Sequence, residues 1–270
     1  MTPLTNVRGS VAFGHSRTRF SAAVSVLLFV SAACGAEIKV MTSGAFTAAY
    51  LQLVPEYERT SHNKVVTAYG ASMGGAPDSI PSRLQRGEPV DVVILASPAL
   101  DELIKQGKVI AGSRVDLVRS SIGLAVRAGA PKPDISSLDA LKRTLLEAKS
   151  IAYSDSASGV YLSQELFRRL GVADQVAGKC KRIAGEPVGA VVARGDAEIG
   201  FQQISELLPV PGIAYVGPLP PGAQKVTVFS AGVAVGAKEP DAGRALIKYF
   251  ASPAVAAVIA KSGVEPVAGH

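Results

Sequence analysis

Short runs rich in serine and glycine follow three predicted strands of this sequence, and a pair of glutamines ends a fourth strand. Each of the three runs is expected to lead into a helix. Backbone N–H groups at a helix start are unpaired and bind oxyanions or carboxylates, while hydroxyl and amide side chains add further donors. The pattern predicts an anion site built from Ser43, Gly44, Ser72, Met73, Ser156, Ser158, Gly159, Gln202 and Gln203.

Each run taken alone also fits a simpler role, because serine at the start of a helix is most often an N-cap. Four such runs at successive strand ends, spread over both halves of the chain, favour a shared anion site. Two arginines, Arg83 and Arg127, could balance the charge of the ligand. A solvated surface position is nevertheless more typical of arginine.

Three side chains near these runs could move a proton to or from a bound ligand, namely Asp155, Tyr161 and Glu186 in order of proximity. The two carboxylates fit a capping or structural role better when each is taken alone, and the tyrosine fits core packing equally well. The three histidines lack the spacing of metal ligands, and Cys180 has no nearby His or Cys. Neither a metal nor a cofactor is therefore predicted.

The elements that must position these residues alternate between β-rich runs and amphipathic helices, which indicates an α/β fold around a parallel sheet. An almost continuous apolar run at residues 91–96 is typical of a strand that is covered on both faces. The expected strands are residues 38–42, 64–70, 91–96, 121–126, 150–155 and 197–203. The expected helices are residues 45–59, 78–86, 98–106, 136–148, 158–170 and 187–194, and two more within 239–262.

This order of elements predicts two lobes joined by two crossings of the chain. The first lobe is expected to comprise residues 37–119 and 225–270, and the second residues 120–224. Residues 209–226 are crowded with proline and glycine and are expected to cross between the lobes. Because ligands bind at the carboxyl ends of strands in such sheets, the site is expected in the cleft between the lobes.

Residues 1–36 have the pattern of a secretory signal peptide, with a basic start, an apolar middle and small residues before Glu37. We expect cleavage after Ala36 and a periplasmic location. A buried first helix is a weaker interpretation, and a lipid anchor on Cys34 is disfavoured by Ser31 three residues before it. Residues 20–33 are too short to span a bilayer comfortably.

Removal of the leader takes away three arginines and no acid, so the formal net charge of +6 falls to about +3. The remaining chain has no run of basic residues and only scattered aromatics, which argues against a nucleic-acid partner. It also lacks an obvious exposed apolar helix, so a monomer is expected.

The turns described above resemble those of the periplasmic molybdate-binding protein family and its relatives. The likeness covers essentially the whole mature chain and includes RGEPVDVVILAS at 86–97, SDSASGVY at 154–161 and GDAEIGFQQ at 195–203. The resemblance implies a type II periplasmic binding protein fold that closes on a small anion.

Two departures from that family argue against molybdate itself. Gln202 and Gln203 stand where molybdate binders usually have a tyrosine, and the first turn is Ser43-Gly44-Ala45-Phe46 instead of a longer stretch. Among the relatives, the runs FTAAY at 46–50, YSDSASGVY at 153–161 and FQQISELLPVPG at 201–212 are similar to bacterial aconitate isomerases of the same fold. This likeness implies a tricarboxylate ligand and the interconversion of trans- and cis-aconitate.

Two functions remain open from the sequence. An isomerase would need a group that removes a proton from the methylene carbon and a group that returns one at the far carbon. The substrate-binding component of an ABC importer, for a molybdate-like oxyanion or a carboxylate, would need only to hinge and to present its ligand to a membrane subunit. A sensor without transport fits the same residues as the importer component.

Overall fold

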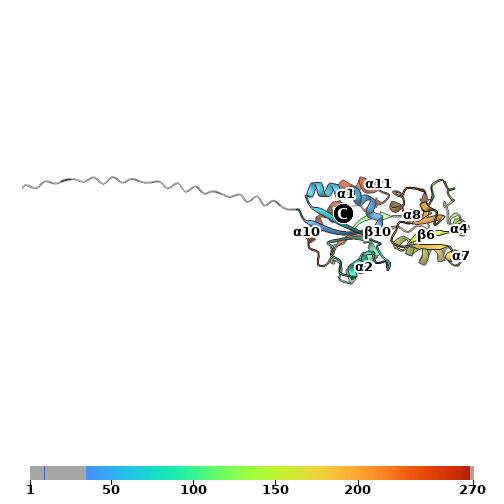
Figure 1. The fold of residues 1–270 in the computed structure, drawn as a ribbon, viewed down its shortest axis with the longest axis horizontal. Coiled ribbons are helices and arrows are strands. Elements are labelled where there is room, and N and C mark those ends of the chain that lie inside the picture. The colour runs from blue at the N-terminus through green and yellow to red at the C-terminus, as the bar shows by residue number, and fades with distance from the viewer. Residues whose placement is uncertain (1–8, 10–34, 268–270) are drawn as a thin grey trace, which may run out of the picture. The chain divides into compact units, whose positions relative to one another are not determined.

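The computed structural model describes Gly9 and residues 35–267. The predicted signal peptide, apart from Gly9, Gly35 and Ala36, lies outside the described residues. The strands of the described part form two sheets, one of six strands and one of five. The α/β class that the sequence predicts is confirmed, and the helices lie around both sheets (Figure 1).

The first sheet has the strand order β11-β4-β10-β3-β1-β2. Its strands are β1 (Glu37–Thr42), β2 (Lys64–Tyr69), β3 (Val92–Ala96), β4 (Val115–Ser120), β10 (Thr227–Val233) and β11 (Glu265–Pro266). The accompanying helices are α1 (Gly44–Ser61), α2 (Ile80–Gln85), α3 (Ser97–Lys105), α10 (Pro240–Phe250), the short 3₁₀ helix η2 (Pro253–Val255) and α11 (Ala256–Lys261). Strands β2, β1 and β3 are parallel, whereas β10 is antiparallel to both β3 and β4.

Aromatic packing anchors α1 and α10 over this sheet. The rings of Phe46 and Phe250 meet edge to face, with their centroids 5.3 Å apart. The centroid of the Tyr50 ring lies 5.6 Å from that of Phe250. All three side chains are fully buried, together with the apolar residues of β1 and β3. Burial of each such side chain contributes about 2 kcal/mol, which fixes the start of α1 at the end of β1.

The second sheet has the strand order β7-β6-β8-β5-β9. Its strands are β5 (Ile122–Arg127), β6 (Ile151–Ser154), β7 (Cys180–Ile183), β8 (Ile199–Gln203) and β9 (Ile213–Pro218). The accompanying helices are α4 (Leu138–Glu147), α5 (Ala157–Tyr161), the π-helix η1 (Leu162–Leu166), α6 (Phe167–Arg169), α7 (Ala173–Ala177), α8 (Val188–Arg194) and α9 (Ile204–Leu207). Strand β6 is parallel to β7 and β8, and β5 is antiparallel to β8 and β9.

The sequence predicted a parallel sheet, and this prediction is wrong in both halves of the molecule. Each sheet contains a strand that runs antiparallel to its neighbours, β10 in the first and β5 in the second. The segment 209–226, expected to be a crossing, contains β9 and crosses only after Pro218. Strand β10 follows that crossing and lies in the middle of the first sheet, beside β3. Two connections therefore join the sheets, Ser121 and residues 219–226. The exact lobe boundaries given above stay a prediction.

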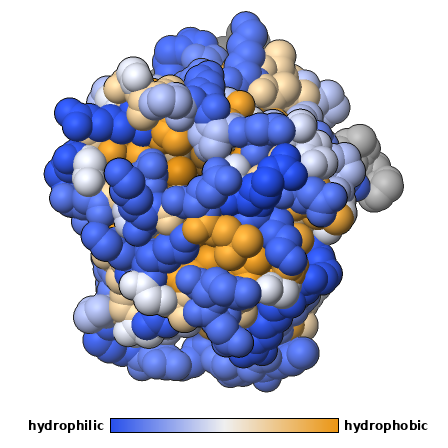
Figure 2. Space-filling model, turned by 90° about the vertical axis from the view of Figure 1, so that its right-hand side faces the viewer, coloured by the Kyte–Doolittle hydropathy of each residue, from blue (hydrophilic) through white to orange (hydrophobic). Residues whose placement is uncertain are grey.

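No single helix of the described residues is long and apolar enough to cross a bilayer. Helix α10 and the following helical stretch, residues 253–261, meet that criterion only as a pair bent by 53°. Figure 2 shows the face beside α4 and α7, where hydrophilic residues surround smaller apolar areas. Leu138 and Leu146 of α4 are about 40 % exposed, which is ordinary for scattered apolar residues on a protein surface.

Candidate functional site

A cavity of about 200 Å³ lies between the two sheets, at the carboxyl ends of β1, β2, β6 and β8. This volume suits a small ligand instead of a drug-sized one. Seven of the nine predicted ligand-binding residues line the cavity: Ser43, Gly44, Ser72, Ser156, Ser158, Gln202 and Gln203. The predicted proton-transfer residues Asp155 and Glu186 also line it.

The structure does not bring Met73, Gly159 or Tyr161 to the cavity. Met73 packs against the core of the first sheet. Gly159 lies against strand β6, where an added Cβ would be only 1.6 Å from the carbonyl oxygen of Ser154. This glycine therefore allows α5 to pack tightly on β6, which explains its presence in the serine-rich run.

Two polar side chains at the cavity are buried without a hydrogen-bond partner among the described residues. Ser43 is 2 % exposed, and its hydroxyl makes no capping bond although Ser43 is the N-cap of α1. Gln203 is also 2 % exposed, and neither its amide oxygen nor its amide nitrogen is paired. Buried polar groups are normally paired, so these two side chains are exceptions that lie at the cavity.

Hydrogen bonds join the two halves of the molecule around the cavity. The backbone N–H of Ser72, which follows β2, donates to Ser156 Oγ at 3.2 Å. The hydroxyl of Ser205 in α9 donates to the carbonyl oxygen of Ala45 in α1 at 2.8 Å. Residues from both halves are therefore held against the same cavity.

A further carboxylate, Glu206, lines the cavity and was missed from the sequence. It is half-buried on the short helix α9, directly after β8. Its Oε1 accepts a hydrogen bond from Gln202 Nε2 at 2.9 Å, while Gln202 Oε1 accepts one from the backbone N–H of Val188. Gln202 thus fixes the position of Glu206. The spacing of four residues between Gln202 and Glu206 is the only sequence signal for this pair.

Burial raises the pKa of Glu206 to about 7, and hydrogen bonds at Gln202 and Gln203 offset only part of that effect. Burial also raises the pKa of Asp155, with Arg182 acting in the opposite direction. Glu186 differs from both, because it is exposed and two hydrogen bonds from Arg194 lower its pKa. Glu206 is therefore a cavity carboxyl whose pKa suits proton exchange near neutral pH.

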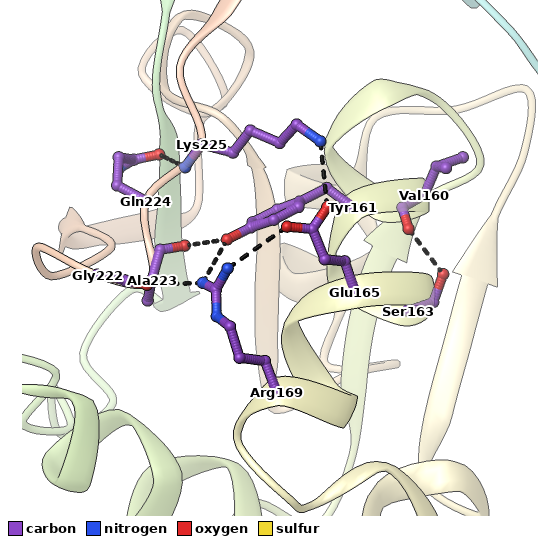
Figure 3. Close-up of polar contacts among 9 residues, drawn as sticks. All are labelled: Val160, Tyr161, Ser163, Glu165, Arg169, Gly222, Ala223, Gln224 and Lys225. Atoms are coloured by element: carbon purple, nitrogen blue, oxygen red, sulfur yellow. Dashed lines mark hydrogen bonds and ion pairs between the residues drawn. The ribbon is translucent and has the colours of Figure 1, made fainter.

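Tyr161 is hydrogen-bonded to the segment 219–226, which connects the two sheets (Figure 3). Its hydroxyl donates to the carbonyl oxygen of Ala223 at 2.8 Å and accepts from Arg169 Nη2 at 2.8 Å. Arg169 also donates to the carbonyl oxygen of Gly222, and Lys225 Nζ lies 4.9 Å from the centroid of the Tyr161 ring. These contacts hold the connecting segment 219–226 against the second half of the molecule.

Comparison with known proteins places the chain in a family. The model of the bacterial extracellular solute-binding proteins matches residues 38–265. The chain belongs to that family. It is 27 % identical to the molybdate-binding protein ModA of Azotobacter vinelandii, over 92 % of this chain and 97 % of that protein. It is 50 % identical to an aconitate isomerase of a Pseudomonas species, over 85 % of this chain and 88 % of that protein.

Among solved structures, the periplasmic molybdate-binding protein of A. vinelandii matches with a TM-score of 0.68 at 20 % identity. The match covers 86 % of this chain and all of that one. The likeness to molybdate-binding proteins and the two-lobed binding-protein fold predicted from the sequence are thereby confirmed. A small-ligand site at the junction of the two lobes is the arrangement expected of a solute-binding protein.

Proposed function

We propose that this solute-binding protein is a periplasmic aconitate isomerase, which interconverts trans-aconitate and cis-aconitate. The observation that carries the proposal is the 50 % identity to the Pseudomonas aconitate isomerase, over most of both chains. The predicted signal peptide, residues 1–36, would deliver the protein to the periplasm as a monomer without a cofactor.

The reaction is an allylic proton shift. A base removes a proton from the methylene carbon, and the C–H electron pair moves into the adjacent carbon–carbon bond. The original double bond shifts its electrons toward the far carbon, which takes up a proton and becomes the new methylene. No atom is gained or lost overall, so the chain needs to supply only carboxylate binding and a proton carrier.

The cavity supports carboxylate binding through neutral donors. Ser43 Oγ and the amide of Gln203 are the unpaired buried donors, and the start of α1 adds backbone N–H groups. Such donors also stabilise the negative charge that spreads onto a carboxylate when the methylene carbon loses its proton. In the proposed reaction, the same donors therefore bind the ligand and stabilise the charge that develops during proton removal.

The negative side chains of the cavity are partly neutralised, which a tricarboxylate ligand requires. Arg194 makes paired hydrogen bonds with Glu186, and Arg182 acts electrostatically on Asp155. Burial raises the pKa of Glu206 to about 7, so this side chain carries less negative charge at neutral pH than an ordinary carboxylate.

The alternative function is the substrate-binding component of an ABC importer for an oxyanion or a carboxylate. The family and the 27 % identical molybdate-binding protein favour it. An importer component would hold its ligand unchanged and pass it to a membrane subunit. Conversion of the ligand by the purified protein therefore separates the two functions.

Proton NMR of trans-aconitate with the purified protein tests the proposal, with molybdate added as a competitor. We expect signals of cis-aconitate to grow in proportion to protein concentration and molybdate to have little effect. Broadening of the trans-aconitate signals without conversion would contradict the isomerase and leave a carboxylate receptor. Binding of molybdate with no response to trans-aconitate would contradict both carboxylate functions.

Tyr161→Phe is expected to keep the isomerisation rate and to lower stability by about 1 kcal/mol. The substitution removes the hydroxyl that donates to Ala223 O and accepts from Arg169 Nη2, and a typical net hydrogen bond contributes about this amount. Urea denaturation gives the stability change, with an unchanged slope against denaturant as the control. A large loss of turnover at unchanged stability would instead place Tyr161 in the chemistry.

A further inference from the structure

We infer that Glu206 is the catalytic residue that carries the proton between the two carbons of aconitate, an inference that rests on the proposed isomerase function. The sequence pointed to Asp155, Tyr161 and Glu186 for this task. The geometry of the cavity points to Glu206 instead.

The carboxyl group of Glu206 lies at the junction of the two halves of the molecule. It comes from α9 of the second half, yet a Cβ added to Gly44 at the start of α1 would be 1.8 Å from Glu206 Oε1. The hydrogen bond from Gln202 holds this carboxyl in place, and the unpaired amide of Gln203 lies in the same cavity. A ligand bound by Ser43 and Gln203 would therefore lie beside Glu206.

Two other acidic residues of the cavity, Glu186 and Asp155, are less suited to take a proton from carbon. Glu186 is exposed and bound to Arg194 at 2.8 and 3.1 Å, which stabilises its charged form and weakens it as a base. Asp155 lies against Gly74, whose added Cβ would be 2.9 Å from the Asp155 carbonyl oxygen, and no other side chain of the described residues donates a hydrogen bond to its carboxylate. Neither carboxyl is anchored by a neutral side chain as Glu206 is.

The described part of the chain places no cation around Glu206 that would hold it permanently charged. Among the described residues, the cavity lining includes no Lys, Arg or His, and its other acids are Asp78, Asp155 and Glu186. Helix α9 packs against α1, α8, β5 and β8. The charged residues of these elements lie at their distant ends: Glu56, Glu58 and Arg59 of α1, Arg194 of α8 and Arg127 of β5. Burial therefore governs the protonation of Glu206.

A group that gives and takes a proton with equal ease suits an isomerase, which must do both in each turnover. The Glu206 carboxylate accepts the proton from the methylene carbon, and the C–H electrons form the new double bond. The protonated Glu206 then donates that proton to the far carbon, and the carboxylate is restored. The two carbons are separated by one carbon only, so a single carboxyl group can serve both.

The test is the kinetics of Glu206→Gln beside Glu206→Asp, with Glu102→Gln as the matched control on the exposed face of α3. Glutamine has the same shape and can still accept the hydrogen bond from Gln202, so folding is expected to be kept. We expect kcat of Glu206→Gln to fall by about 10³-fold while trans-aconitate still binds. Glu206→Asp should recover part of the lost turnover, and Glu102→Gln should match the unaltered protein.

The pH profile gives a readout that a structural role would not move. A base must be ionised before it acts, so kcat/KM of the unaltered protein should rise with pH and level off above about pH 7. The residual rate of Glu206→Gln should lack this rise. Turnover of Glu206→Gln close to that of the unaltered protein would overturn the role of Glu206 and leave the isomerase standing. Absence of turnover in the unaltered protein would overturn the proposed function itself.

Discussion

Gly44→Ala is expected to lower the isomerisation rate by about 10²-fold or more, as expected for loss of a positioned acid–base group, while leaving the fold intact. The new methyl group would lie 1.8 Å from Glu206 Oε1 and 2.5 Å from its Cδ, so the carboxyl must leave its present position. The end of a flexible side chain can make this move without disturbing the backbone. Turnover and thermal unfolding of the same sample measure the two effects.

The backbone of Gly44 tolerates alanine, because this residue begins α1 and has an ordinary helical conformation. Alanine in a helix is favoured over glycine by up to about 1 kcal/mol, so the midpoint of unfolding should stay the same or rise. Gly178→Ala is the matched control, since its added Cβ meets nothing within 4 Å and its φ is −71°. Equal turnover of Gly44→Ala and Gly178→Ala would contradict the position assigned to Glu206.

Gln203→Leu is expected to weaken trans-aconitate binding by about 10- to 100-fold while stabilising the free protein. Both polar atoms of the Gln203 side chain are buried without a partner among the described residues, and such groups cost about 1–3 kcal/mol each in the free protein. Leucine has a similar size and removes that cost. It also removes the donor that would bind a carboxylate, and each tenfold loss of affinity corresponds to about 1.4 kcal/mol.

The neighbouring residue provides the matched comparison. Gln202 has a similar burial, but its amide accepts from the backbone N–H of Val188 and donates to Glu206. Gln202→Leu would leave the Val188 donor unpaired in the interior and should therefore destabilise the protein by about 1–3 kcal/mol. Calorimetric titration and thermal unfolding follow both variants. If Gln203→Leu also destabilised the free protein and left affinity unchanged, Gln203 would be a packing residue.

The sequence predicted residues that the fold gathers at one cavity, but it did not predict the antiparallel strands of the two sheets. Serine and glutamine at strand ends can be recognised as candidate binding residues from the sequence alone, because the strand end and the helix start lie next to each other in the chain. This is why Ser43 and Gln203 could be expected at one cavity without knowledge of the fold. Their lack of partners is visible only once burial is known.

Glu206, Met73 and Tyr161 show where such local inference fails. Glu206 lies beyond the strand on a helix of four residues, too short to produce an amphipathic pattern. Its closeness to Gly44 from the other half of the molecule is visible only in the fold. Tyr161 is one helical turn beyond a cavity serine, yet it points to the segment 219–226. Met73 lies in a serine- and glycine-rich run but packs against the first core.

The missed strands have a similar cause. Strand β9 is flanked by Pro and Gly residues that are typical of a connection, and β10 finds its partners β3 and β4 more than a hundred residues earlier in the chain. Pairing over such distances leaves little trace in a local pattern of apolar residues. The antiparallel strands of both sheets were therefore not expected.

The most direct test of the central claim is to follow the reaction to equilibrium from each of the two acids separately. One sample of the purified protein starts with pure trans-aconitate and a second with pure cis-aconitate, and NMR follows the ratio of the two acids. An isomerase must bring both samples to the same final ratio, and we predict that it does so here. Two ratios that stay at their starting values over the same period, with both acids bound, would contradict the account and identify a receptor.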